Sequence, residues 1–231
     1  MTDRAFDAIG GGGMAVSIGG HLVARALADN GVRCVFTLCG GHIAPIYDGC
    51  LRYGIDIVDT RHEQAAAHAA DAWARLARAP GVAIVTAGPG VTDAVTGVAN
   101  AMLAQSPLVV LGGAAELRLA GRGALQEMEQ LSLMRSITKW SATVTDPKRL
   151  PEMVNTAVRH ANSGVRGPVF LELPFDVLTA QVDDAQLPPS TRRPRSSPSR
   201  SGRSCSSARR SGGTTRPKCC ASWSCGSASR R

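Results

Sequence analysis

Short, continuously apolar runs recur along the first three quarters of the chain and are separated by segments of helical character. This pattern is typical of strands that are covered on both faces of a parallel sheet. It predicts strands at residues 34–38, 55–58, 82–86, 108–111 and 169–173, and a further extended segment at residues 137–144.

The segments between the runs predict helices. Leu22, Val23, Ala26 and Leu27 fall on one helical face that ends at Gly31, and Asp146 is a typical cap for a helix. Alternating strands and helices predict an α/β fold, a doubly wound and mostly parallel sheet with helices on both faces. Ligands bind at the carboxyl ends of such strands. The other predicted helices cover residues 43–53, 63–78, 91–103 and 147–162.

The glycine-rich positions predict turns at the ends of these strands. Gly40-Gly41 follows the first strand, Gly88-Pro89-Gly90 follows the third, and Gly112-Gly113 is expected to end the fourth. The Gly-Pro-Gly turn is a weak match to nucleotide-binding motifs, because it lacks the Lys and Ser or Thr of a P-loop.

Charge is unevenly distributed. Residues 1–190 contain 15 Lys and Arg against all 18 Asp and Glu, whereas residues 191–231 contain 11 Lys and Arg and no acid. The formal net charge of +8 therefore arises entirely in the last segment. An argument for nucleic-acid or membrane binding from overall charge would concern that segment alone.

Residues 191–231 contain twelve serines and ten arginines but no Leu, Ile, Val or Phe. Such a segment buries too little apolar area to offset its chain entropy and is predicted to be disordered. It suits a basic tail that binds nucleic acid, a linker, or the wrong reading frame of a GC-rich coding sequence. The abrupt change and the scattered Cys and Trp favour the third interpretation. We predict a flexible leader at 1–15, one folded domain at 16–182, and a linker with an Arg/Ser-rich tail at 183–231.

The seven cysteines have no metal-ligand spacing. Cys34, Cys39 and Cys50 are far apart in sequence, and we interpret them as small buried or loop thiols. Neither a secretion signal nor a membrane span is recognisable, so a reduced, cytoplasmic setting is expected.

Glu63 follows a predicted strand and begins the alanine-rich helix. A glutamate in the first helical turn commonly interacts with free backbone N–H groups, and spacing alone favours this role. The functional alternative is a carboxyl group at the ligand-binding edge of the sheet, in apolar surroundings. His62 and His68 are interpreted as capping or packing residues. No metal site is predicted, because His62, Glu63 and His68 are poorly spaced for one helical face.

Many motifs, in the right order, resemble the N-terminal, pyrimidine-binding domain of thiamine-diphosphate enzymes. The most informative are Asp59–Glu63 with the alanine-rich helix after it, and Thr86–Gly90. The resemblance covers residues 16–178 and lies within the branch of acetolactate synthases, 2-hydroxyacyl-CoA lyases and benzaldehyde lyase. Further similar stretches are Phe36–Ile43, Ala104–Pro107, Gly123–Gln126, Glu129–Leu133, Ile137–Trp140 and Gly167–Pro174.

This resemblance implies thiamine diphosphate as cofactor. It implies that Glu63 pairs with a ring nitrogen of the aminopyrimidine, so that the exocyclic nitrogen becomes a base and activates the thiazolium carbon. His42 would face the substrate and relay protons, and Gln126 would approach the reaction centre. His42 also favours the lyases, because acetolactate synthases typically have Pro before two glycines at this turn. The residues expected around the cofactor with Glu63 are Gly41, Thr86, Pro89 and Asp93, the last standing where relatives commonly have Asn.

The resemblance also implies what is missing. In the family, a C-terminal domain with a Gly-Asp-Gly stretch and later Asn residues holds the diphosphate and Mg²⁺, and this sequence has no such segment. We therefore expect a chain cut off before the remaining domains and inactive alone. Its expected partners are thiamine diphosphate and a second copy or a separate diphosphate-domain chain, which makes an interaction module the second interpretation. Nucleic-acid binding through the tail ranks third.

Overall fold

The computed structural model describes residues 16–183, 185 and 187. The described residues belong to one compact unit. The predicted leader at 1–15, and all of the predicted linker and tail except residues 183, 185 and 187, lie outside the described residues.

A six-stranded sheet forms the centre of the domain, with strand order β3-β2-β4-β5-β7-β6. All neighbouring strands are parallel, which confirms the predicted fold class. A separate antiparallel pair, β1 (Val16–Ile18) with β8 (Gln181–Asp183), joins the two ends of the domain. The strands of the main sheet are β2 (Cys34–Thr37), β3 (Asp56–Asp59), β4 (Gly81–Val85), β5 (Leu108–Ala114), β6 (Trp140–Thr143) and β7 (Val169–Pro174).

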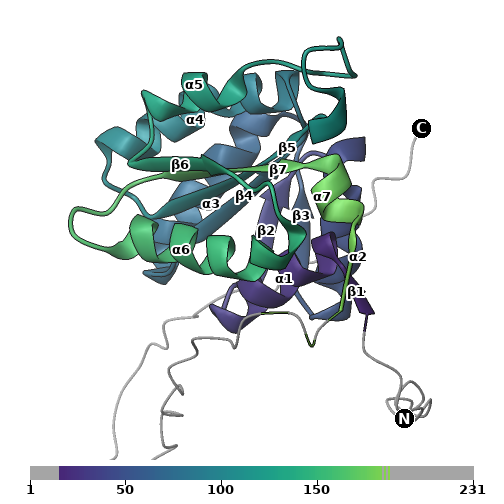
Figure 1. The fold of residues 1–231 in the computed structure, drawn as a ribbon. Helices are drawn as coiled ribbons and strands as arrows, with labels where there is room; N and C mark the ends of the chain where they lie inside the picture. The colour runs from purple at the N-terminus through teal and green to yellow at the C-terminus, as the bar shows by residue number, and fades with distance from the viewer. Residues whose placement is uncertain (1–15, 184, 186, 188–231) are drawn as a thin grey trace, which may run out of the picture. The chain divides into compact units, whose positions relative to one another are not determined.

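Helices cover both faces of the sheet, as Figure 1 shows. One buried cluster joins α1 (Gly19–Asp29), α2 (Ala44–Arg52) and α6 (Leu150–Asn162) to the sheet. A second cluster on the opposite face involves α3 (Glu63–Ala77), α4 (Pro89–Leu103) and α5 (Gln130–Arg135). The short helix α7 (Phe175–Thr179) follows β7 directly. The continuously apolar strands are explained by this arrangement, since both faces of the central strands are buried.

The predicted end of the fourth strand at Gly112-Gly113 is wrong, because β5 continues through both glycines to Ala114 and pairs there with β7. The glycines serve close packing instead. A Cβ on Gly112 would lie 2.5 Å from the ring of Phe170, and one on Gly113 would lie 2.8 Å from Cβ of His42. Gly113 therefore lets the turn after β2 approach β5.

Two predicted helices are interrupted at their start. The segment predicted as a helix at 43–53 begins with a 3₁₀ turn, Gly41–Ile43, before α2. The segment at 147–162 begins with the 3₁₀ turn Pro147–Arg149, before α6. The predicted cap is confirmed, because the Asp146 carboxylate accepts from Lys148 N at 2.9 Å. The extended segment predicted at 137–144 is a strand only at Trp140–Thr143.

Small residues let α3 and α4 pack closely. A Cβ on Gly97 of α4 would lie 2.6 Å from Cβ of Ala67 in α3. The predicted capping role of His62 is confirmed, because its Nδ1 accepts from Gln64 N at 3.1 Å. The start of α3, and with it Glu63, is thus fixed beside the start of α4.

None of the helices in the described part of the chain is long and apolar enough to span a membrane.

Candidate functional site at the carboxyl edge of the sheet

A cavity of about 580 Å³ opens at the carboxyl ends of the parallel strands. The chain leaves β2 toward β3 on one side and returns to β4 on the other, so β2 and β4 flank a switch point of the sheet. Such a point is the usual ligand site of a doubly wound fold. The cavity is lined by Cys39, Gly40, Gly41, His42, Glu63, Thr86, Pro89, Gly90, Ala115, Glu116, Leu119, Ala124, Leu125, Gln126 and Phe175.

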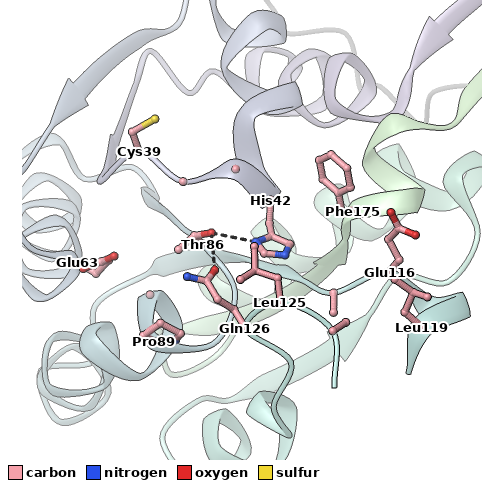
Figure 2. Close-up of a pocket in the computed structure, with 15 residues that line it drawn as sticks. Cys39, His42, Glu63, Thr86, Pro89, Glu116, Leu119, Leu125, Gln126 and Phe175 are labelled. Atoms are coloured by element: carbon pink, nitrogen blue, oxygen red, sulfur yellow. Dashed lines mark hydrogen bonds between the residues drawn. The ribbon is translucent and has the colours of Figure 1, made fainter. Parts of the chain in front are cut away.

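The structure brings together the predicted residues Glu63, His42 and Gln126 with Gly41, Thr86 and Pro89 around this cavity. They come from four different connections, after β2, after β3, after β4 and before α5. Figure 2 shows the side chains of Glu63, His42, Gln126, Thr86 and Pro89 around the same space. Asp93 does not line the cavity.

Glu63 is buried, with 7% of its surface exposed, although it lines the cavity. Its carboxyl group has no hydrogen-bond or ion-pair partner within the described part of the chain. A Cβ on Gly90 would lie only 3.4 Å from Oε1 of Glu63, so the missing side chain of Gly90 leaves the cavity wall next to this carboxyl group uncovered. Burying a carboxyl group without a partner is costly, and such groups in native proteins usually meet a ligand.

His42, Thr86 and Gln126 form a chain of polar contacts across the cavity. Nδ1 of His42 lies 3.3 Å from Oγ1 of Thr86, which in turn donates to Oε1 of Gln126 at 3.5 Å. Both are drawn as dashed lines in Figure 2. The Phe175 ring and the His42 imidazole are nearly perpendicular, at 82°, with ring centroids 6.1 Å apart.

Burial lowers the pKa of His42 below its ordinary value, although the Leu125 carbonyl and the Gln126 side chain act in the opposite direction. His42 is therefore neutral at pH 7, and its imidazole is able to accept a proton.

We expect Phe175→Ala to raise the pKa of His42 toward its ordinary value, because the truncation admits water to the imidazole. An NMR titration of the histidine ring protons would measure the change. The ring-proton signals of His21 serve as an internal control, because that residue lies outside the cavity. An unchanged or lower His42 pKa would contradict burial as its cause.

Asp93 pairs with His62 instead of lining the cavity, with Oδ2 of Asp93 lying 3.7 Å from Nε2 of His62. The ligand atoms of His62, Glu63 and Asp93 lie within 4.8 Å of one another, a spacing that a metal ion would also allow. The cap argues against a metal, however. Since Nδ1 of His62 accepts a backbone N–H, Nε2 of the neutral ring carries the proton and has no lone pair for a metal.

The end of the cavity away from Glu63 is lined by Leu119, Leu125 and Phe175 together with Glu116 (Figure 2), and sequence reasoning missed most of it. Phe175 was in principle recognisable, because it follows the last strand directly and therefore belongs to the same edge of the sheet. The exposed Cys39 also lines the cavity, whereas Cys34 and Cys50 are buried free thiols, which confirms their interpretation as loop and core residues.

The fold and this cavity agree with the comparison to known proteins. The chain matches the family described as thiamine pyrophosphate enzyme, N-terminal TPP binding domain, over residues 18–133. This match covers half of the chain, and the chain belongs to that family.

Its relatives include 2-hydroxyacyl-CoA lyases and an acetolactate synthase. The chain is 52% identical over 160 residues to 2-hydroxyacyl-CoA lyase 2 of Danio rerio, covering 69% of this chain and 26% of that protein. It is equally similar, at 52% over 160 residues, to 2-hydroxyacyl-CoA lyase 2 of Homo sapiens, covering 69% of this chain and 25% of the human protein. It is 42% identical over 169 residues to acetolactate synthase large subunit IlvG of Mycobacterium tuberculosis, covering 73% of this chain and 31% of that protein. The chain thus spans about a quarter to a third of the length of these curated relatives.

The residues present fit the aminopyrimidine half of thiamine diphosphate. The buried, unpartnered carboxyl of Glu63 is a suitable partner for a protonated ring nitrogen. A Cβ on Gly40 or Gly90 would lie within 2.7 Å of Thr86, so both glycines allow their backbone to pack closely on that residue. Gly41, in contrast, has open space where a Cβ would stand. Pro89 adds an apolar surface at the cavity wall.

Proposed function

We propose that this chain is the pyrimidine-binding half of a thiamine-diphosphate enzyme that cleaves or forms carbon–carbon bonds, of the 2-hydroxyacyl-CoA lyase kind. The observation that carries the proposal is the Glu63 carboxyl, buried without a partner in a cavity at the switch point of the sheet. When bound, the cofactor supplies the electron sink for breaking and making the bond.

The side chains around the cavity have different roles in this reaction. Glu63 shares a proton with a ring nitrogen of the cofactor and so controls the protonation of the ring. His42, neutral at pH 7, accepts a proton from the substrate hydroxyl or returns one to it. Gln126 orients polar atoms of the substrate between them. The apolar side chains of Leu119, Leu125 and Phe175 exclude water from the reacting groups.

We place this chain with the lyases because of the Gly-His sequence of the turn after β2. That turn puts an imidazole on the cavity wall next to Thr86. The greater identity to the lyases than to the synthase, 52% against 42%, supports the same choice.

The remaining half of the site comes from outside the residues described here. Our proposal is that a diphosphate-binding domain, on another chain or another segment, holds Mg²⁺ through oxygen ligands and completes the cavity. The coverage of only about a quarter of the lyase relatives supports this. The chain alone is then inactive.

The test has two arms. The purified chain with thiamine diphosphate and Mg²⁺ is expected to show no cleavage of a 2-hydroxyacyl-CoA ester. A chimera in which residues 16–178 replace the matching segment of the zebrafish lyase is expected to cleave it. Turnover by the chain alone would contradict the split site. A folded chimera that binds the cofactor but is inactive toward both this ester and pyruvate would refute the proposed reaction.

A further inference from the structure

Gln130, the first residue of α5, is almost completely buried, with 1% of its surface exposed, and does not line the 580 Å³ cavity. Both polar atoms of its side-chain amide form hydrogen bonds with the backbone. Nε2 donates to the carbonyl oxygen of Gly113 at 2.7 Å, and Oε1 accepts from the backbone N–H of Gly88 at 3.0 Å. One side chain thus connects the end of β5, the turn before α4 and the start of α5.

The segment just before Gln130 forms one wall of the cavity through Ala124, Leu125 and Gln126. It is folded upon itself, because the Glu127 carboxylate accepts from the backbone N–H groups of Gly121 and Ala124. This internal folding gives the segment a shape but does not attach it to the sheet. The attachment has to come from contacts with the strand ends.

Beyond the strand ends, the His42 imidazole interacts with the Leu125 carbonyl and the Gln126 side chain. The Gln126 carbonyl packs on Gly88, where a Cβ would lie 2.6 Å from that oxygen. The hydrogen bond from Thr86 to Gln126 is long, at 3.5 Å. The two hydrogen bonds of Gln130, at 2.7 and 3.0 Å, are shorter than this one and bind the start of α5 directly to backbone groups of Gly113 and Gly88.

We infer that Gln130 is a positioning residue, which fixes the cavity wall 124–126 and the Gly88 turn in register with each other. An amide suits this task, because the two backbone groups require one donor and one acceptor. A methionine of similar length supplies neither, and a glutamate supplies the acceptor for Gly88 only. The catalytic meaning of this placement rests on the proposed function, but the placement itself is a property of this chain.

Two variants and a control separate positioning from simple stabilisation. Gln130→Met removes both bonds, and Gln130→Glu retains the bond from Gly88. Thr138→Val is the matched control, because Thr138 is also buried and its hydroxyl donates to Met134 O at the other end of α5. All three are expected to lower global stability through a lost buried hydrogen bond.

Amide hydrogen exchange of the ¹⁵N-labelled chain is the measurement. With Gln130→Met, amides of residues 121–127 and of Gly88 are expected to exchange about tenfold faster or more, relative to those of β4. With Gln130→Glu, residues 121–127 accelerate while Gly88 stays protected. The His42 ring signals are expected to shift in both variants and to stay in place in Thr138→Val.

Acceleration of residues 121–127 no greater than in Thr138→Val, with unchanged His42 signals, would overturn the inference. If Gln130→Met does not fold, Gln130→Glu alone tests the inference. Faster exchange at residues 121–127 with a protected Gly88 amide would support it, and equal protection of both would contradict it. These readouts need no cofactor. An inactive chimera would therefore count against the proposed function only. The role of Gln130 would still be decided by hydrogen exchange.

Discussion

Glu63→Gln is expected to lower turnover of the completed enzyme by about 10²- to 10⁴-fold, the usual contribution of a positioned proton-transfer group. The amide is nearly isosteric with the carboxyl, so the shape of the cavity is preserved. It does not exchange a proton with a ring nitrogen, however, and leaves the ring without the group that controls its protonation. The measurement is steady-state cleavage by the chimera that carries residues 16–178.

The same substitution is expected to leave the isolated chain as stable as before, or more stable. Glu63 is 7% exposed and its carboxyl group has no protein partner in the described residues, so replacing it removes a buried acid without breaking a bond. Urea unfolding of the chain alone would show it. A loss of activity with retained stability would show that Glu63 serves the reaction and does not stabilise the fold.

Glu172→Gln provides the control. Glu172 is partly buried on β7 and accepts a hydrogen bond from Thr143, but it does not line the 580 Å³ cavity. It is expected to keep nearly full turnover. Equal turnover of Glu63→Gln and the parent chimera, or a marked loss of stability in Glu63→Gln, would show that Glu63 is a structural first-turn residue.

The parts of the site that sequence reasoning located follow from one rule. Continuous apolar runs identify the parallel strands, and the residue after each run then belongs to the ligand-binding edge. Glu63 and His42 stand just beyond such runs and Thr86 ends one, so the rule places them at this edge, but their functional roles came from the family resemblance. Gln126 follows no such run, and only the resemblance indicated it.

The parts that were missed depend on which segments meet in three dimensions. Gly112 and Gly113 look like a turn in the sequence, yet they are strand residues whose missing side chains admit Phe170 and His42. Gln130 stands at the start of an amphipathic segment like many surface amides. Its burial follows from the meeting of α5 with two strand ends, which no local pattern encodes.

Asp71 is the residue whose loss should cost the most stability among the polar groups of the described chain. It is 3% exposed, and both its oxygens accept from the Arg75 guanidinium, while Asn100 of α4 donates to Oδ2 at 3.0 Å. Arg75 Nε also donates to the buried Ser106 hydroxyl at 3.0 Å. The network joins α3, α4 and the start of β5.

We expect Asp71→Ala to lower the free energy of unfolding by about 2 kcal/mol, the scale of charge-assisted hydrogen bonds. A buried ion pair would cost more to break, but the Arg75 side chain is 49% exposed and turns to water once its partner is gone. Urea unfolding of the chain at pH 7 measures the loss. Glu152→Ala is the control, because its pair with Arg149 is half exposed on both sides and contributes little.

The pH dependence distinguishes this network from a simple packing defect. Burial raises the pKa of Asp71, but the hydrogen bonds from Arg75, Ser106 and Asn100 outweigh it, so the pKa lies below its ordinary value. A carboxyl with a lowered folded pKa contributes stability above the unfolded value near 4, and that contribution disappears as the pH falls through the folded pKa. The gap between the parent chain and Asp71→Ala should therefore narrow in acid, whereas a packing defect gives a gap that is constant with pH. Because Asp71 lies two helical turns beyond Glu63 on the same helix, the variant should lose activity only in proportion to its unfolded fraction, in contrast to Glu63→Gln.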